Sequence, residues 1–156
     1  MWRPNAPTRR RVLSWALAAP CLGSFTSSAA ATAARTDSEI ALFAAGRPVD
    51  TGDLTLEVPE VAESGYSVPV VLRSGGADDP ITRVRLLAPD NPLVRIATFH
   101  VGDTGCPLRL ATRIRLARSQ TVIALAETAG GRVLRAEGMV AVVVGGCGFD
   151  LPLEPG

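Results

Sequence analysis

Seven short apolar runs, separated by turn sequences at intervals of roughly 8 to 15 residues, constrain the fold of this chain most strongly. No helical period interrupts them, and glycine, proline and aspartate punctuate the gaps. Such a succession is typical of an antiparallel β-sandwich. The sequence therefore predicts an all-β domain. The runs are GDLTLEVP, YSVPVVLR, ITRVRLLAP, VRIATFHV, LRLATRIRLA, TVIALAET and RVLRAEGMVAVVVGG.

One short helix is predicted before the strands, over residues 36–46. Asp37 or Ser38 can cap its start, and Gly46 can end it. Its apolar face would consist of Ile40, Phe43 and Ala44.

The first 34 residues have the features of an export signal. The twin arginine Arg9–Arg10 precedes an apolar stretch and then a run of small residues, which indicates the twin-arginine route to a bacterial periplasm. Cleavage is expected after Ala31, Ala33 or Ala34, with the last two favoured. The apolar stretch is too short for stable insertion across a bilayer. An uncleaved anchor is one alternative, and lipidation of Cys21 is another, although the preceding Pro20 disfavours it.

The predicted organisation is a signal peptide at 1–34, one domain at 35–144, and an arm with a tail at 145–156. From residue 35 onward the chain has 12 arginines against 15 acidic residues, a net charge of −3. A mildly acidic domain is a poor partner for nucleic acid, because binding phosphate requires a basic surface.

Two cysteines, Cys106 and Cys147, follow the predicted leader. An even number of thiols in an oxidising compartment is consistent with one disulfide, closing a loop of about 40 residues. Cys147, however, lies among Gly145, Gly146 and Gly148, directly after an apolar run. Glycine frees the backbone, which suits the presentation of a sulfur atom better than its packing. No basic residue neighbours Cys147 in sequence, so it is expected to be acted upon rather than to catalyse.

Other chemistries have little support in the sequence. The single histidine, His100, and two distant cysteines do not form a metal site, and no triad, phosphate loop or dinucleotide motif is present. His100 is more readily interpreted as a surface or structural residue than as a general base. The pairs Arg83/Arg85 and Arg113/Arg115 have the spacing of one strand face. Each could receive an acidic partner or a sulfonate, or form a solvated face.

Several stretches resemble the SoxY family of sulfur-oxidation carrier proteins. They are VPEVAESGYSVPV, IATFH, TRIRLA followed by VIALAE, and the closing GGCG, within about residues 36 to 149. The resemblance implies an exported immunoglobulin-like sandwich that pairs with a SoxZ-like subunit and is itself no enzyme. It also implies that Cys147 carries sulfur intermediates covalently, with no other cofactor, and that Gly145, Gly146 and Gly148 form a swinging arm. Partner enzymes would load and process the cargo.

The sequence departs from the family pattern in two places. Phe149 replaces the last glycine of the usual motif and a tail follows, and Cys106 is additional. The alternation of Phe149, Leu151 and Leu153 with polar residues or proline predicts that the tail lies against the domain or its partner. Two alternatives to a carrier remain at this stage. One is an exported interaction module with a Cys106–Cys147 disulfide and no cargo; the other is a thiol-dependent redox enzyme, which lacks a second nearby cysteine or base.

Overall fold

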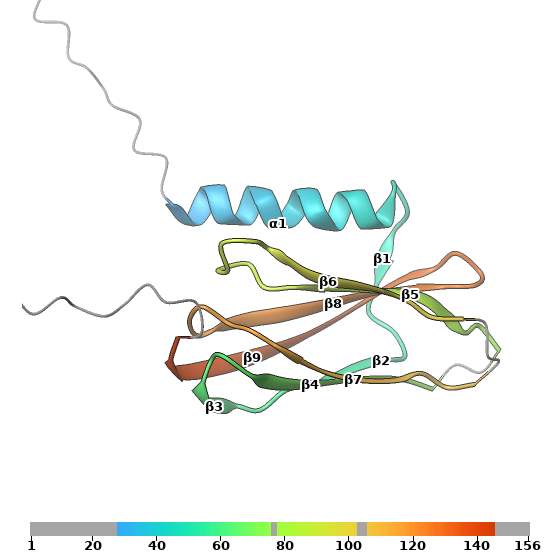
Figure 1. The fold of residues 1–156 in the computed structure, drawn as a ribbon. Coiled ribbons are helices and arrows are strands. Elements are labelled where there is room, and N and C mark those ends of the chain that lie inside the picture. Colours follow the sequence, from blue (N-terminus) through green and yellow to red (C-terminus); the bar gives the residue numbers. More distant parts are fainter. Residues whose placement is uncertain (1–27, 76–77, 103–105, 146–156) are drawn as a thin grey trace, which may run out of the picture.

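The computed structural model describes residues 28–75, 78–102 and 106–145. It consists of one helix and short to medium strands that form two layers (Figure 1). In chain order the elements are α1 (Ser28–Ala44), β1 (Val49–Asp50), β2 (Leu54–Glu57), β3 (Val61–Ser64), β4 (Val68–Ser74), β5 (Ile81–Leu87), β6 (Arg95–His100), β7 (Arg109–Ile114), β8 (Gln120–Thr128) and β9 (Val133–Val144).

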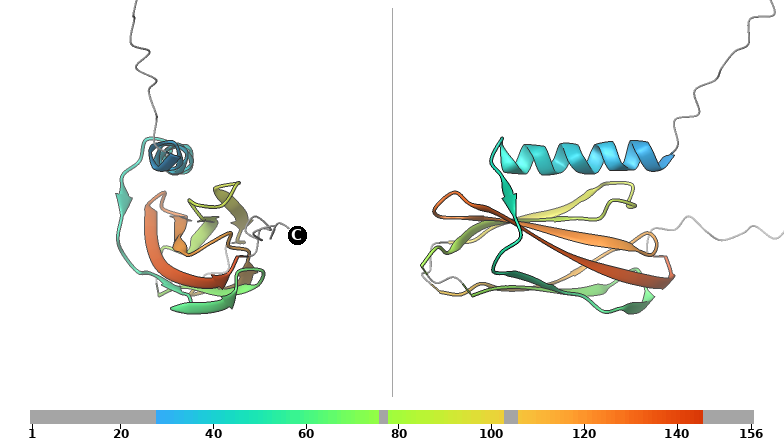
Figure 2. Two further views of the ribbon diagram at one scale, coloured as in Figure 1. Left: turned by 90° about the vertical axis from the view of Figure 1, so that its left-hand side faces the viewer. Right: turned by 180° about the vertical axis from the view of Figure 1, so that it is seen from behind.

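The two layers are β-sheets of unequal size. The larger sheet has the order β1-β9-β8-β5-β6, with β3 also paired to β9, and the smaller has the order β2-β4-β7. Helix α1 lies across the outer side of the larger sheet, which the end-on view shows most clearly (Figure 2). The expected immunoglobulin-like β-sandwich with an N-terminal helix is therefore confirmed.

The core lies between the two sheets and follows the two-residue period of each strand. On β4, Val68, Val70 and Leu72 are buried, while Pro69 is exposed. Strand β2 pairs with β4 only from Val71 onward, so Pro69, which has no N–H, lies where β7 is the only paired neighbour. From the larger sheet, Val84, Leu86, Val122, Ala124, Ala126, Leu134 and Val140 complete this core.

All seven predicted runs form strands, but two further strands were not predicted. Strands β1 and β3 are only two and four residues long, and both pair with β9 in parallel. Their pairing depends on a strand more than 70 residues away in the chain, which local alternation does not reveal. A hairpin joins β8 to β9, with Gly131 at φ +82° in its turn.

The predicted start of the helix at Asp37 or Ser38 is wrong. Helix α1 begins at Ser28, and Ser38 lies inside it, where its hydroxyl donates a 2.8 Å hydrogen bond to the carbonyl of Ala34. The alanine-rich segment before Asp37 has high helix propensity and extends the helix into the predicted leader. The predicted end is close to the observed one, because Ala45 and Gly46 both have positive φ after Ala44.

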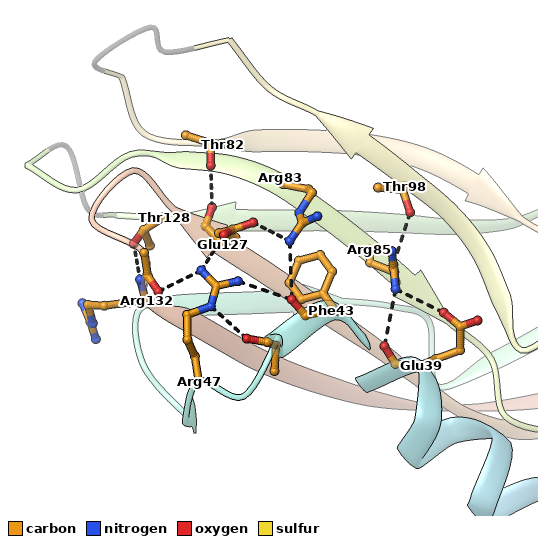
Figure 3. Close-up of polar contacts among 12 residues, drawn as sticks. Glu39, Phe43, Arg47, Thr82, Arg83, Arg85, Thr98, Glu127, Thr128 and Arg132 are labelled. Carbon is orange, nitrogen blue, oxygen red and sulfur yellow. Dashed lines mark hydrogen bonds and ion pairs between the residues drawn. The ribbon is translucent and has the colours of Figure 1, made fainter. Parts of the chain in front are cut away.

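Phe43 docks the helix onto the larger sheet (Figure 3). It is fully buried, and the guanidinium carbons of Arg83 and Arg85 lie 4.5 and 5.1 Å from its ring centre. Arg85 also pairs with Glu39 at 3.2 Å, whereas Arg83 pairs with Glu127 at 2.6 Å. The Phe43 ring and the Arg85–Glu39 pair therefore fix the helix on the sheet, while the Arg83–Glu127 pair joins β5 to β8 beneath it.

Glu127 is the shared acceptor beneath the helix end. Arg47, just after α1, forms a second ion pair with it and donates a 3.1 Å hydrogen bond to the carbonyl of Gly131. Burial raises the pKa of Glu127, but the hydrogen bonds and charges of Arg47 and Arg83 outweigh burial and hold this pKa below its usual value. Glu127 is therefore ionised at neutral pH.

Replacement of Phe43 by alanine should lower the free energy of unfolding by about 3–5 kcal/mol, because it leaves a cavity between helix and sheet. Leu42→Ala, at the neighbouring exposed position of the same helix, is the control and should change it by less than about 0.5 kcal/mol. Urea denaturation measures both. Equal small losses for the two variants would show that α1 contributes no packing energy.

Candidate functional site at the end of strand β9

The end of β9 is hydrogen-bonded to two neighbouring connections. The amide of Gly65, in the β3–β4 turn, donates to the carbonyl of Val144 at 2.7 Å, and the amide of Leu116 donates to the carbonyl of Gly65 at 2.8 Å. Strand β3 also pairs with β9 up to Ser64↔Val144. The last residue of β9 is therefore fixed by the β3–β4 turn, which is in turn fixed by the β7–β8 connection.

Two buried amide side chains hold the β7–β8 connection, residues 115–119. Asn91, 8% exposed, donates to the carbonyl of Arg115 and accepts from the amide of Ala117, both at 2.8 Å. Gln120, 3% exposed, donates to the Asn91 side chain at 2.9 Å and accepts from the amide of Asp90 at 2.8 Å. A fully bonded buried network of this kind rigidifies the backbone that it holds.

Gly145 rests directly on this connection. A Cβ atom at residue 145 would overlap the carbonyl oxygen of Ala117, which is a backbone atom and cannot rotate away. Its φ is not in the left-handed region, so space and not backbone conformation requires glycine here. Gly145, predicted as part of a swinging arm, is thus a packed position at the base of that arm.

The outer face of β9 is apolar and uncovered near this end. Val143 is 71% exposed, and Val61 and Met139 are each 61% exposed. Ala141 is also exposed, and its register partner on β3 is Val61. We call this surface the β9 apolar strip; it consists of Val61, Met139, Ala141 and Val143. It lies on the same face of the sheet as Val133, which α1 covers at the other end of β9.

The remaining predicted site residues separate into two groups. Gly146, Cys147 and Gly148 lie outside the described residues. Cys106 is described; it is an exposed free thiol in the β6–β7 connection. That connection lies at the opposite end of the sandwich from the end of β9 (Figure 1).

The two arginine pairs have different environments. Arg83 and Arg85 lie beneath α1 and pair with acids there, so this pair is neither a solvated face nor an open anion site. Arg113 and Arg115 are exposed, and Arg113 donates to the carbonyl of Ser67 at 3.1 Å. Sequence spacing is identical in both pairs, and only the docking of α1 distinguishes them.

Residues that could hold a metal are not grouped in the described ranges. Within them no three His, Cys, Asp or Glu side chains come together, and His100 is exposed at the end of β6. No helix in the described part is both long and apolar enough to cross a membrane. The residues that shape the arm base, Asn91, Ala117 and Gln120, were not predicted, because they lie in segments with the composition of ordinary turns.

Fold and site together define an immunoglobulin-like β-sandwich protein with a sterically fixed exit from its longest strand. The family described as "Sulfur oxidation protein SoxY" matches residues 39–147, and the chain belongs to this family. No curated protein sequence matches the chain.

One solved structure agrees with this assignment, and another shares the fold. The sulfur carrier protein SoxY from Chlorobium limicola f thiosulfatophilum is 25% identical, with a TM-score of 0.59 over 72% of this chain and 99% of its own. A superoxide reductase (neelaredoxin) from Ignicoccus hospitalis is 16% identical, with a TM-score of 0.50 over 59% of this chain and 81% of its own, and shares the fold alone. The relation to a sulfur carrier supports a carrier role in sulfur oxidation for this chain.

Gly145→Ala should destabilise the end of β9, because the added methyl group forces the strand away from Ala117. Overpacking of this kind costs about 1–3 kcal/mol. Gly102→Ala is a matched control, because a Cβ there has no atom within 4 Å. Thermal unfolding and amide hydrogen exchange at Gly65 and Leu116 report the effect. Identical behaviour of the two variants would contradict the steric role of Gly145.

Proposed function

We propose that this protein carries sulfur intermediates covalently on Cys147 and presents them to sulfur-oxidising enzymes. The observation that carries the proposal is the family match, which extends through Cys147, immediately beyond the fixed end of β9. Gly145 is anchored on Ala117, and two residues later the chain reaches the thiol. The Cα atom of Cys147 can therefore lie at most about 7 Å from the Cα atom of Gly145.

The chemistry follows from the nucleophilicity of a thiolate. Oxidative coupling joins the Cys147 thiolate to the sulfane sulfur of thiosulfate, giving a cysteine S-thiosulfonate and two electrons, which a partner redox enzyme accepts. Hydrolysis by a second enzyme then releases sulfate and two protons and leaves a persulfide on the protein. The chain contributes the attachment atom and its presentation, and the partners contribute catalysis.

A disulfide between Cys106 and Cys147, the main alternative, has an unfavourable geometry. Strand β7 has six residues and separates the β6–β7 connection from the β7–β8 connection on which Gly145 rests. The two connections are therefore about 17–20 Å apart along β7. Two residues beyond Gly145 and a disulfide Cα separation of up to about 6.8 Å together span roughly 14 Å. Under the carrier proposal, Cys106 and Cys147 form no disulfide with each other.

Export to the periplasm through the twin-arginine route is part of the proposal. The leader motif supports it, as does the distribution of contacts along α1. The buried side chains of this helix, Thr36, Phe43 and Ala44, all follow the favoured cleavage positions at Ala33 and Ala34. Removal of residues 1–34 would therefore leave the docked part of the helix in place.

A SoxZ-like subunit is the proposed stable partner, and the β9 apolar strip is the surface proposed to meet it. The strip is exposed, apolar and adjacent to the arm base. Uncovered apolar strips of this kind mark interaction surfaces.

Cys147→Ser should abolish thiosulfate-dependent electron transfer in a system reconstituted with the partner enzymes, while changing the free energy of unfolding by less than about 0.5 kcal/mol. The reason is that only the attachment atom is lost. Cys106→Ser is the control and should retain activity. A large loss of stability in Cys147→Ser together with full activity would show that the thiol is structural and that the carrier proposal is wrong.

Val143→Glu should weaken binding of the SoxZ-like subunit by at least about tenfold, because a carboxylate would be buried in an apolar contact. Leu42→Glu is a matched control, since Leu42 on α1 is 71% exposed, as is Val143. Isothermal titration with the purified subunit measures both affinities. Weakening by Leu42→Glu alone would place the interface on the helix and not on the strip.

A further inference from the structure

Two exposed arginines lie next to the arm base. Arg115 and Arg118 are exposed and lie on either side of Ala117 in the β7–β8 connection. Among the described residues neither forms an ion pair, whereas six other arginines do. Both guanidinium groups are therefore available to an anion that comes from outside the described residues.

The backbone of both arginines is held by the buried amide pair. The carbonyl of Arg115 accepts a 2.8 Å hydrogen bond from Asn91, and the carbonyl of Arg118 accepts one from Gln120 at 3.3 Å. The two side chains thus project from a fixed segment, although they are themselves exposed. A fixed origin reduces the entropy lost when a charged side chain binds a ligand.

The same segment carries the anchor of the arm. The carbonyl of Ala117, between the two arginines, is the group on which Gly145 packs. Cys147 follows two residues later and can extend at most about 7 Å from Gly145. Arg115 and Arg118 lie within two residues of Ala117 in the chain, so both side chains originate close to this volume.

We propose that Arg115 and Arg118 form a docking site for the anionic sulfonate end of cargo on Cys147. The inference rests on the proposed carrier function and deepens it. A guanidinium presents paired donors that match the oxygens of a sulfonate, as they do those of carboxylate and phosphate. Cargo that ends in a sulfonate is held at the arm base, and an uncharged adduct is not. Docking therefore depends on the chemical state of the cargo.

The test uses the full chain with Cys21 and Cys106 both replaced by serine, so that Cys147 is the only thiol. Tetrathionate converts the thiolate to the S-thiosulfonate and releases thiosulfate. Methyl methanethiosulfonate gives an uncharged methylthio adduct on the same atom. Mass spectrometry verifies both loadings, and an uncharged phosphine then removes each adduct at a measured rate.

Docking shields the sulfane sulfur from the phosphine. Arg115→Gln/Arg118→Gln should therefore release the thiosulfonate about three- to fivefold faster than the parent, as expected for the loss of exposed ion pairs. The methylthio adduct should be released at the same rate in both. Arg109→Gln, at the other end of β7, is the control and should change neither rate. In the parent, the arginine Nε–Hε resonances of both residues should shift on thiosulfonate loading only.

Equal thiosulfonate release rates in parent and double variant, with loading verified, would overturn the docking site and leave the carrier proposal intact. A second pair of results would also overturn the docking site: Nε–Hε resonances that do not shift on loading, and weaker enzyme binding by the double variant in every cargo state. Together these two results would assign the arginines to the recognition of an acidic partner surface. Failure of tetrathionate to load Cys147 at all would count against both proposals, because a carrier requires an accessible thiol.

Discussion

Strand β9 is hydrogen-bonded along both of its edges, and this pairing determines where the chain leaves the sandwich. Strand β8 occupies one edge over most of its length, while β1 and β3 pair with the other edge near its two ends. Val144 cannot shift without breaking the hydrogen bond from Gly65, and any side chain at residue 145 would overlap the carbonyl of Ala117. The position of the arm base is thus a consequence of sheet topology together with the glycine at residue 145.

The charged residues show how one topology gives similar motifs different roles. Arg83 and Arg85 are neutralised beneath α1 by Glu127 and Glu39, and their guanidinium groups stack against an aromatic ring. Arg115 and Arg118 lie in the β7–β8 connection, which joins the two sheets. No acidic side chain among the described residues pairs with either of them. The first group stabilises the fold, and the second is free for recognition.

Seven of the strands could be predicted from sequence, because in each of them apolar and polar residues alternate or a turn signal lies on both sides. Strands β1 and β3 could not, because they are short and their partner is distant in the chain. The alanine-rich segment before Asp37 has the composition of a leader as well as a high helix propensity, and sequence alone does not show that α1 begins there, at Ser28. At the site, glycine was expected before Cys147 for its freedom. The structure gives Gly145 the opposite reason, a close backbone contact that depends on Asn91 and Gln120 far away in sequence.

The fixed position of Gly145 also determines how strong a contact near the arm base needs to be. A group tethered two residues from its anchor meets the neighbouring surface at an effective concentration of at least about millimolar order, without any loss of translational freedom on each encounter. A contact whose bimolecular dissociation constant lies in that range would be populated about half of the time. Such a contact opens rapidly, so it would hold a tethered group at the end of the sandwich without trapping it there.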